Sequence, residues 1–580
     1  MGQGHQIPCG QGSRRALREG DAPPPPSGVT PENAVRARRR RGTLRVPAED
    51  PDFNRALDAM TAPELRTFVR GVLDGLDPDA RTEIVDSLMA RAVKGHAGWK
   101  PRRPSQRIAD DAKSFAEAAR VVGYADPTDV SEHLRLGSRA FLAGDHVSAR
   151  GVFEALLPPI AAADIDLGQH ELVDEVLGVD AHMCVAQYVT SVYTTTPLAD
   201  RAAAVHTAIE QVEGVSALLN PIQDMEDVSA GALPDLDAFL PLWATRLRRR
   251  RPSKDEWESN PERWHREAVF RSQGVDGLEQ LARKTKRPQS CLAWCEALAD
   301  GERWPEALRA YDAAAMLVGK PHWRGQLLDG SALAAQQLGR ADVPRRLEAA
   351  WRGAPTLPRL LRWLTSDGHT IATLRVKAKK ALTRCPKDAG RQVGLLHVLV
   401  GDLGAAATLL SKASGLGWSS EDHPGHVVFP LLAVLLANGT PGRVSDALLA
   451  QLESGGRDPM EAFVDDTAEQ KPRLATPSIV AMIQNVRPSL RVTDADRNVS
   501  IDAMRTAAEK RVEGILGNSR RRHYGHAALL VASCLAFSPK RREAECSTWY
   551  AELLQKYSRR SAFRQELMRA FVSLGVSAPA

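Results

Sequence analysis

The sequence predicts an all-α protein in which helical hairpins form a divergent α-solenoid in two blocks. Apolar residues recur three and four positions apart in many windows, which is the period of an amphipathic helix. Capping residues, prolines and glycines separate these windows at short intervals. The chain contains no convincing run of alternating β-branched and polar residues, so a fold built on a β-sheet is not expected.

The first 50 residues differ from the rest of the 580-residue chain. They contain four consecutive prolines, Pro23–Pro26, and the basic run Arg38–Arg41, but almost no large apolar side chains. Such a segment cannot bury enough apolar surface to offset its chain entropy, so a disordered basic tail is predicted for residues 1–50. The tail holds nine Arg and five acidic residues, so most of the formal net charge of +6 lies in it.

Amphipathic helices follow in close succession and predict an N-terminal helical domain over residues 51–247. Thr61-Ala-Pro-Glu64 has the pattern of a capping box with proline in the first helical turn. The next helix places six apolar residues on one face: Leu65, Phe68, Val69, Val72, Leu73 and Leu76. Asp77-Pro78 then begins a second amphipathic helix, which ends near Gly95.

The segment Leu136–Pro158 has the spacing of a tetratricopeptide (TPR) unit. Small residues stand where two helices cross closely, a large residue fills the groove between them, and proline follows the second helix. Similar but irregular spacings recur later in the chain, at Gly401–Ala413, Trp304–Ala314 and Leu338–Ala350. Irregular copies favour a divergent TPR-like array over a regular solenoid. The run Arg248–Arg251 before Pro252 predicts a boundary, so the C-terminal array is assigned to residues 253–580.

The helix pair Met60–Ala92 resembles the region that follows the zinc finger in bacterial SWIM-type zinc-finger proteins. The later order of segments is similar too: the hairpin Leu136–Pro158, the acidic turn Asp164–Gly168, the tryptophan-bearing hairpin 291–315 and the closing segment Trp549–Phe563. The resemblance spans roughly residues 55–570 and implies a helical scaffold for protein interaction. The sequence has no Cys-x-Cys or Cys-x-His, so no zinc ligand is carried over from that family.

Several short motifs contain residue types that could form a metal or catalytic site. Cys291 and Cys295 stand one helical turn apart, but no second pair or nearby His completes a metal site, so core packing is predicted. The pairs His423-Pro-Gly-His426 and His523-Tyr-Gly-His526 lack supporting ligands and are interpreted as surface or capping histidines. The chain has no phosphate loop and no nucleophile elbow. No catalytic residue, metal or cofactor is therefore predicted, and the protein is not expected to be an enzyme.

The predicted function is a non-catalytic scaffold that binds another protein or peptide in grooves between helix pairs. Aromatic residues in two hairpins are candidates for such a groove or for the inter-helix core: Phe141, Phe153, Trp294, Trp304 and Tyr311. The alternative is a nucleic-acid-associated protein that uses a basic helical face and the arm formed by Arg38, Arg39, Arg40 and Arg41. The other basic runs are interpreted as solvated helix ends.

A cytoplasmic location without a membrane partner is predicted. The seven cysteines are few and odd in number, which is typical of a reducing compartment. The first residues lack the charged start and apolar run of a signal peptide. The longest strongly apolar stretch, Val427–Ala437, contains Pro430 and is shorter than the roughly 18 residues that a membrane span needs.

Overall fold

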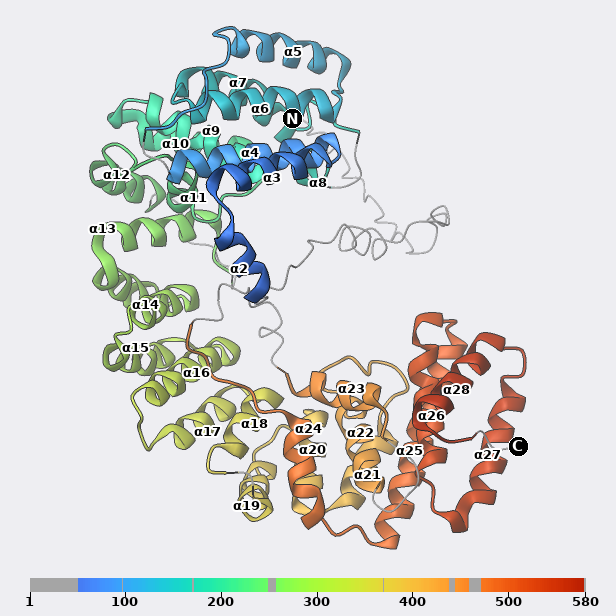
Figure 1. The fold of residues 1–580 in the computed structure, drawn as a ribbon. Coiled ribbons are helices and arrows are strands. Elements are labelled where there is room, and N and C mark those ends of the chain that lie inside the picture. Colours follow the sequence, from blue (N-terminus) through green and yellow to red (C-terminus); the bar gives the residue numbers. More distant parts are fainter. Residues whose placement is uncertain are drawn as a thin grey trace, which may run out of the picture. The chain divides into compact units, whose positions relative to one another are not determined.

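The computed structural model describes residues 51–95, 98–168, 172–248, 257–368, 370–437, 444–457 and 471–577 (Figure 1). Throughout these residues the regular elements are helices, and the one β contact is an isolated bridge between Tyr124 and Asp166. The predicted all-α helical-hairpin fold is therefore confirmed. The tail predicted for residues 1–50 lies outside the described residues. The chain divides into a smaller unit that ends at Gly95 and a larger unit that begins at His96.

The smaller unit contains α2 (Pro51–Ala59), α3 (Ala62–Asp74) and α4 (Pro78–Gly95). The predicted capping box begins α3: the Thr61 backbone amide donates to Glu64 Oε2 at 2.8 Å, and the Glu64 amide donates to Thr61 Oγ1 at 3.5 Å. Arg81 Nε donates to the Leu73 carbonyl at 2.8 Å and so fastens α4 to the end of α3. The apolar side chains of both helices remain largely exposed, as Phe68 and Leu88 illustrate.

The larger unit begins with paired helices that pack around α7 and α9. The TPR-like segment forms the hairpin α6–α7, in which a Cβ at Gly137 would meet the Phe153 ring at 3.1 Å. Glycine at this position therefore allows the close crossing that the spacing predicted. The helices of this part are α5 (Ile108–Val122), α6 (Pro127–Leu142), α7 (His146–Ala161), α8 (Val173–Val176), α9 (Ala181–Thr195), α10 (Leu198–Val212), α11 (Pro221–Val228) and α12 (Leu236–Arg248).

From α13 to α21 each helix packs against the next along the chain. Proline occupies the first turn of every helix from α13 to α18, where its missing amide costs no helical hydrogen bond. Helix α12 packs against α13 across the boundary predicted at residues 247–253, and the division there stays a prediction. The helices are α13 (Asn260–Thr285), α14 (Pro288–Asp300), α15 (Trp304–Leu317), α16 (Pro321–Gln337), α17 (Val343–Gly353), α18 (Leu357–Thr365), α19 (Ile371–Leu382), α20 (Gly390–Val400) and α21 (Leu403–Lys412).

The last part of the larger unit departs from this sequential packing, because α25 packs against α21, and α23 packs against α18. Helix α22 is the most apolar and is buried along almost its whole length. None of the described helices combines the length and hydropathy of a membrane-spanning helix. The helices are α22 (Gly425–Leu436), α23 (Asp446–Gly456), α24 (Ile479–Val486), η3 (Arg487–Ser489), α25 (Asp494–Gly517), η4 (Arg521–His523), α26 (Tyr524–Ala536), η5 (Lys540–Arg542), α27 (Glu543–Lys556) and α28 (Ser561–Leu574).

The extended segment before α24, residues 471–478, returns to helices much earlier in the chain. Its Lys471 Nζ lies 2.8 Å from Asp300 Oδ1 at the end of α14. Leu474 packs against the main hydrophobic core, and Ser478 Oγ donates to Glu453 Oε2 of α23 at 2.8 Å. Figure 1 shows this orange segment running past α16 and α18. We call residues 471–478 the return segment.

Candidate functional site

The aromatic candidates lie inside helix pairs. Phe141 of α6 and Phe153 of α7 are buried within their hairpin, and the imidazole of His146 meets the Phe141 ring edge-on at 5.1 Å. Trp294 of α14 and Tyr311 of α15 are buried in the neighbouring core. These four side chains therefore pack helix against helix, and their role in binding a partner stays a prediction.

Trp304, the fifth aromatic candidate, is half-buried at the start of α15 and packs against the same core as Trp294. Burial raises the pKa of the Tyr311 hydroxyl, as expected for a core tyrosine. The arm Arg38–Arg41 lies outside the described residues.

Both cysteines of the Cys291–Cys295 pair are buried in α14. Burial raises the pKa of the Cys291 thiol to about 11, and it raises the pKa of Cys295 as well. Such thiols remain protonated at neutral pH and are poor nucleophiles. No three His, Cys, Asp or Glu side chains in the described ranges are grouped as a metal site requires.

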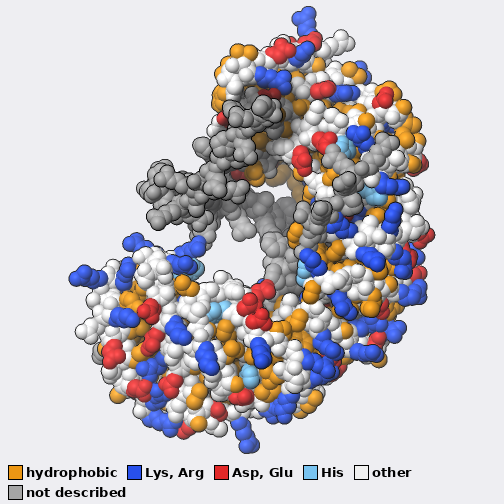
Figure 2. Space-filling model, turned by 180° about the vertical axis from the view of Figure 1, so that it is seen from behind, with side chains coloured by type: hydrophobic (Ala, Val, Ile, Leu, Met, Phe, Trp, Pro, Cys, Tyr) orange, Lys and Arg blue, Asp and Glu red, His pale blue; other side chains and the backbone are white. Residues whose placement is uncertain are grey.

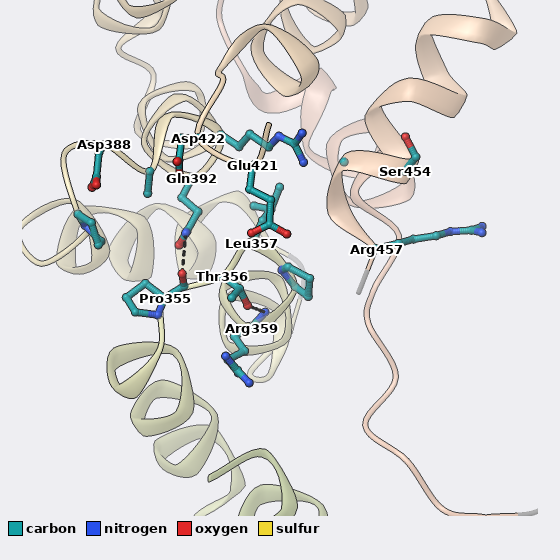
Figure 3. A pocket seen from close by; sticks show the side chains of 15 residues that line it. Pro355, Thr356, Leu357, Arg359, Asp388, Gln392, Glu421, Asp422, Ser454 and Arg457 are labelled. Atoms are coloured by element: carbon teal, nitrogen blue, oxygen red, sulfur yellow. Dashed lines mark hydrogen bonds between the residues drawn. The ribbon is translucent and has the colours of Figure 1, made fainter. Parts of the chain in front are cut away.

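A polar cleft of about 320 Å³ opens where the ends of several helices meet (Figure 3). Four stretches form its walls: the start of α18 from Pro355 to Arg359, the turn Pro386–Gln392 that begins α20, the pair Glu421–Asp422 before α22, and the end of α23 from Ser454 to Arg457. These stretches span about 100 positions of the sequence, and the packing of α23 against α18 brings them together. We call this cavity the cleft.

One wall of the cleft is fixed by internal hydrogen bonds. Trp351 Nε1 donates to Gln392 Oε1 at 2.8 Å, and Gln392 Nε2 donates to the Pro355 carbonyl at 3.2 Å. Arg359 Nε donates to Asp329 Oδ2 at 2.7 Å, so this guanidinium is neutralised within the fold. These side chains shape the cleft, but their polar groups are already occupied.

The rim of the cleft offers groups that remain free. In the described part of the chain, Asp388, Glu421, Asp422 and Arg457 are exposed and have no hydrogen bond or ion pair through their side chains. Figure 3 shows Glu421 extending toward Leu357, whereas Arg457 points away from the other lining residues. Carboxylates in this state can accept hydrogen bonds from lysine or arginine side chains of another molecule.

Behind the α23 wall lies a partly buried group of polar side chains that the sequence did not indicate. His423 and His426 meet His526 of the second histidine pair there, about 100 positions away in the sequence. His426 Nε2 lies 3.2 Å from Ser454 Oγ at the cleft, and His526 Nε2 lies 3.0 Å from Gln451 Oε1. Trp418 packs between the pairs. We call the following set the histidine–arginine cluster: His423, His426, His526, Arg511, Gln451 and Trp418.

The charge in this cluster belongs to Arg511. Its Nε lies 3.3 Å from His526 Nδ1, its Nη1 donates to the Gly415 carbonyl at 3.2 Å, and its guanidinium lies 5.6 Å from the centre of the Trp418 ring. Burial and the Arg511 charge lower the pKa of His526 to about 3. Burial and the Arg391 charge lower the pKa of His426 to about 4. Both imidazoles are therefore neutral at pH 7.

The interpretation of these histidines as surface or capping residues fits only part of the set. His423 has a capping role, since its Nδ1 accepts from the Gly425 amide at 3.0 Å at the start of α22. His526 instead packs inside, edge-on to the Trp418 ring with 5.0 Å between ring centres. Nothing in the local spacing of either pair shows that the two pairs meet, because the meeting depends on how α25 packs against α21.

A second exposed feature is a basic surface on α17 and α19. Glu348 of α17 accepts from Lys380 Nζ at 2.6 Å and lies 3.4 Å from Arg384 Nη1. Further exposed basic side chains lie on α17, on α19 and in the turn after α19. We call the following six residues the basic surface: Arg345, Arg352, Lys379, Lys380, Arg384 and Lys387.

Comparisons with known proteins do not assign a family. No family model matches the chain, and no curated protein matches it. Among solved structures, the chain is similar to one described as an IFIT1 monomeric mutant with Gppp-AAAA. The similarity covers 80% of this chain and 98% of that chain, at 11% sequence identity and a TM-score of 0.16. So low a TM-score carries no weight for function, which therefore rests on the residues of this chain.

Proposed function

We propose that the protein is a non-catalytic α-helical scaffold that binds another protein or peptide, and that the cleft is its docking site. The observation that carries the proposal is a set of exposed charges at the rim that make no hydrogen bond or ion pair among the described residues: Asp388, Glu421, Asp422 and Arg457. The positive charge of Arg391 acts on Glu421 and Asp422 without forming an ion pair with either. The opposite wall is held rigid by the Trp351–Gln392–Pro355 hydrogen bonds. A rigid site loses little entropy when it binds, which favours recognition of a partner segment.

Capture from the native host, with chemical crosslinking and mass spectrometry, tests the proposal. The wild-type chain is compared with E421K/D422K, which reverses the charge at the rim. The matched control is E117K/E132K, since Glu117 and Glu132 are exposed acids of α5 and α6 that do not line the cleft. We expect a protein partner that the wild type and the control recover and that E421K/D422K loses. Failure of the wild-type chain to recover any partner, with or without crosslinking, contradicts the scaffold function.

The basic surface favours one second candidate, a nucleic-acid-associated protein that also uses the Arg38–Arg41 arm. Phosphate contacts would give an affinity that falls steeply with salt. Filter retention of labelled DNA and RNA at about 150 mM salt tests this function, because genuine phosphate contacts remain measurable there. Negligible retention removes the candidate.

A further inference from the structure

The basic surface lies in the most positively charged stretch of the larger unit. Residues 340–391 contain thirteen Lys and Arg residues but four Asp and Glu residues, whereas the whole chain has 77 against 71. The near balance of basic and acidic residues over the whole chain hides this local excess of positive charge. A local field of one sign attracts oppositely charged partners within about 8–10 Å at physiological salt.

Internal ion pairs account for several of these thirteen charges. Arg346 binds Asp312 and Asp342, Arg359 binds Asp329, and Lys377 binds Asp367. These pairs hold neighbouring helices together, and they do not contribute an available positive charge. The available charge is therefore confined to the side chains that face solvent.

Four side chains of the basic surface are exposed and have no hydrogen bond or ion pair among the described residues: Arg345, Arg352, Lys379 and Lys387. On α17, Arg345 and Arg352 lie three positions before and four positions after Glu348, so all three share one face. Lys380 of α19 and Arg384, just after that helix, contact the same acid. Two basic groups therefore contact Glu348, and two more share its helix face; Figure 2 shows blue Lys and Arg side chains over the lower right of that view.

The aromatic residues beneath this surface argue against a nucleic acid as its partner. The centre of the Trp363 ring lies 5.6 Å from Lys380 Nζ. The same ring stacks on Trp351 with 5.1 Å between ring centres. Both rings are buried, at 3% and 1% exposure, so they offer no face for base stacking. The basic surface therefore has no stacking platform in Trp351 or Trp363.

We infer that the basic surface binds an acidic segment of the partner protein. The inference rests on the proposed scaffold function and names the chemistry of the partner. Lys387 connects the surface to the cleft, since its neighbours Pro386 and Asp388 line the cleft. A partner segment that enters the cleft therefore meets the basic surface as it leaves, and acidic residues at that point are attracted by Arg345, Arg352 and Lys379.

Fluorescence anisotropy with defined probes tests the inference on the full chain. The probe is a labelled peptide of about 16 alternating Glu and Ser residues, which extends over about 50 Å. The comparison peptide replaces Glu with Gln, and the nucleic-acid probe is an oligouridylate of similar length. The test variant R345E/R352E/K379E reverses the charge of three side chains that have no hydrogen bond or ion pair among the described residues. The matched control K113E/R521E/R559E makes the same change in net charge at exposed residues elsewhere.

We expect the Glu peptide to bind the wild type and the control equally, and to bind R345E/R352E/K379E at least about tenfold more weakly. The Gln peptide is expected not to bind. Equal binding of the Glu peptide to all three proteins overturns the inference. The inference is also overturned if the oligouridylate binds the wild type more tightly than the Glu peptide does and R345E/R352E/K379E loses this binding. That result would assign the surface to nucleic acid.

The capture experiment separates this inference from the scaffold function. Loss of the partner by R345E/R352E/K379E supports the inference. A partner that this variant retains and that E421K/D422K loses overturns the inference and leaves the scaffold function standing. When the wild type recovers no partner, the scaffold function fails, and the peptide titration still decides what the basic surface binds.

Discussion

The helix contacts around α14–α15 involve mainly apolar side chains, whereas those around α22–α26 include polar and charged side chains. Between α14 and α15 the buried groups are apolar or behave as such, and they include Cys291, Trp294, Cys295 and Tyr311. Between α22 and α26 the chain buries His423 and the charged Arg511, beside partly buried histidines and a glutamine. The first interface depends on volume alone, whereas the second also depends on protonation and hydrogen bonding.

The largest effect is expected in the apolar interface. Trp294→Ala removes a large side chain that is 4% exposed, and it should lower the free energy of unfolding by about 3–5 kcal/mol. Denaturant titration measures the loss. Met316→Ala on the neighbouring α15, where the side chain is 78% exposed, is the control and should change stability by less than about 0.5 kcal/mol. Similar losses in both variants would show that Trp294 is not a core residue.

A smaller loss is expected in the polar interface. Arg511→Met keeps most of the side-chain volume, but it leaves the Gly415 carbonyl and His526 Nδ1 without their donor. The unpaired groups should cost about 1–3 kcal/mol in the same titration. Arg521→Met, at an exposed arginine of η4, is the control. If Arg511→Met is more stable than the wild type, the desolvation penalty of the buried guanidinium exceeds the stabilisation from its hydrogen bonds.

The two interfaces should also differ in their response to pH. His526 and His426 have pKa values of about 3 and 4 in the folded chain, below the ordinary histidine value of 6.5. Between about pH 6.5 and pH 4 the unfolded chain binds protons that the folded cluster does not, so acidification in this window lowers stability. Thermal unfolding should show a midpoint that falls as the pH is lowered through this range.

His526→Gln keeps a hydrogen-bonding side chain and removes one of the two titrating groups. We expect a shallower decline of the unfolding midpoint below pH 6.5 than in the wild type. His133→Gln on α6 lies outside the cluster and should leave the decline unchanged. An identical pH profile for wild type and His526→Gln would place the proton uptake elsewhere.

The smallest effect concerns the thiols of the apolar interface. Because burial raises the pKa values of Cys291 and Cys295, iodoacetamide at pH 8 should leave both unmodified in the native protein. Peptide mass spectrometry reads each cysteine separately, and labelling in denaturant is the positive control. Rapid native labelling of either thiol would indicate that α14 opens frequently.

Local patterns predicted the fold well, because caps and helix pairs are decided by residues close in the sequence. The capping box at Thr61–Glu64 and the close crossing at Gly137 both follow from spacings of a few residues. The apolar faces of α3 and α4 were predicted correctly as faces, but the described structure leaves them largely exposed. Periodicity identifies an apolar face without identifying what covers it.

The cleft and the histidine–arginine cluster could not be predicted, since each joins residues about 100 positions apart. Their formation depends on α25 packing against α21 and α23 against α18, which no local spacing encodes. The basic surface, in contrast, left a readable signal in the composition of residues 340–391. That signal is hidden when basic runs are sought only as consecutive residues, because the charges of α17 and α19 are interspersed with apolar positions.

The return segment has a consequence for how the larger unit unfolds. In a linear array of helix pairs each pair contacts its immediate neighbours, so the ends can fray while the middle remains folded. The ion pair between Lys471 and Asp300 joins residues 171 positions apart, but it is exposed and contributes little to stability. Leu474 packs on the main hydrophobic core, so the return segment should lose its structure together with that core rather than fray as a free end.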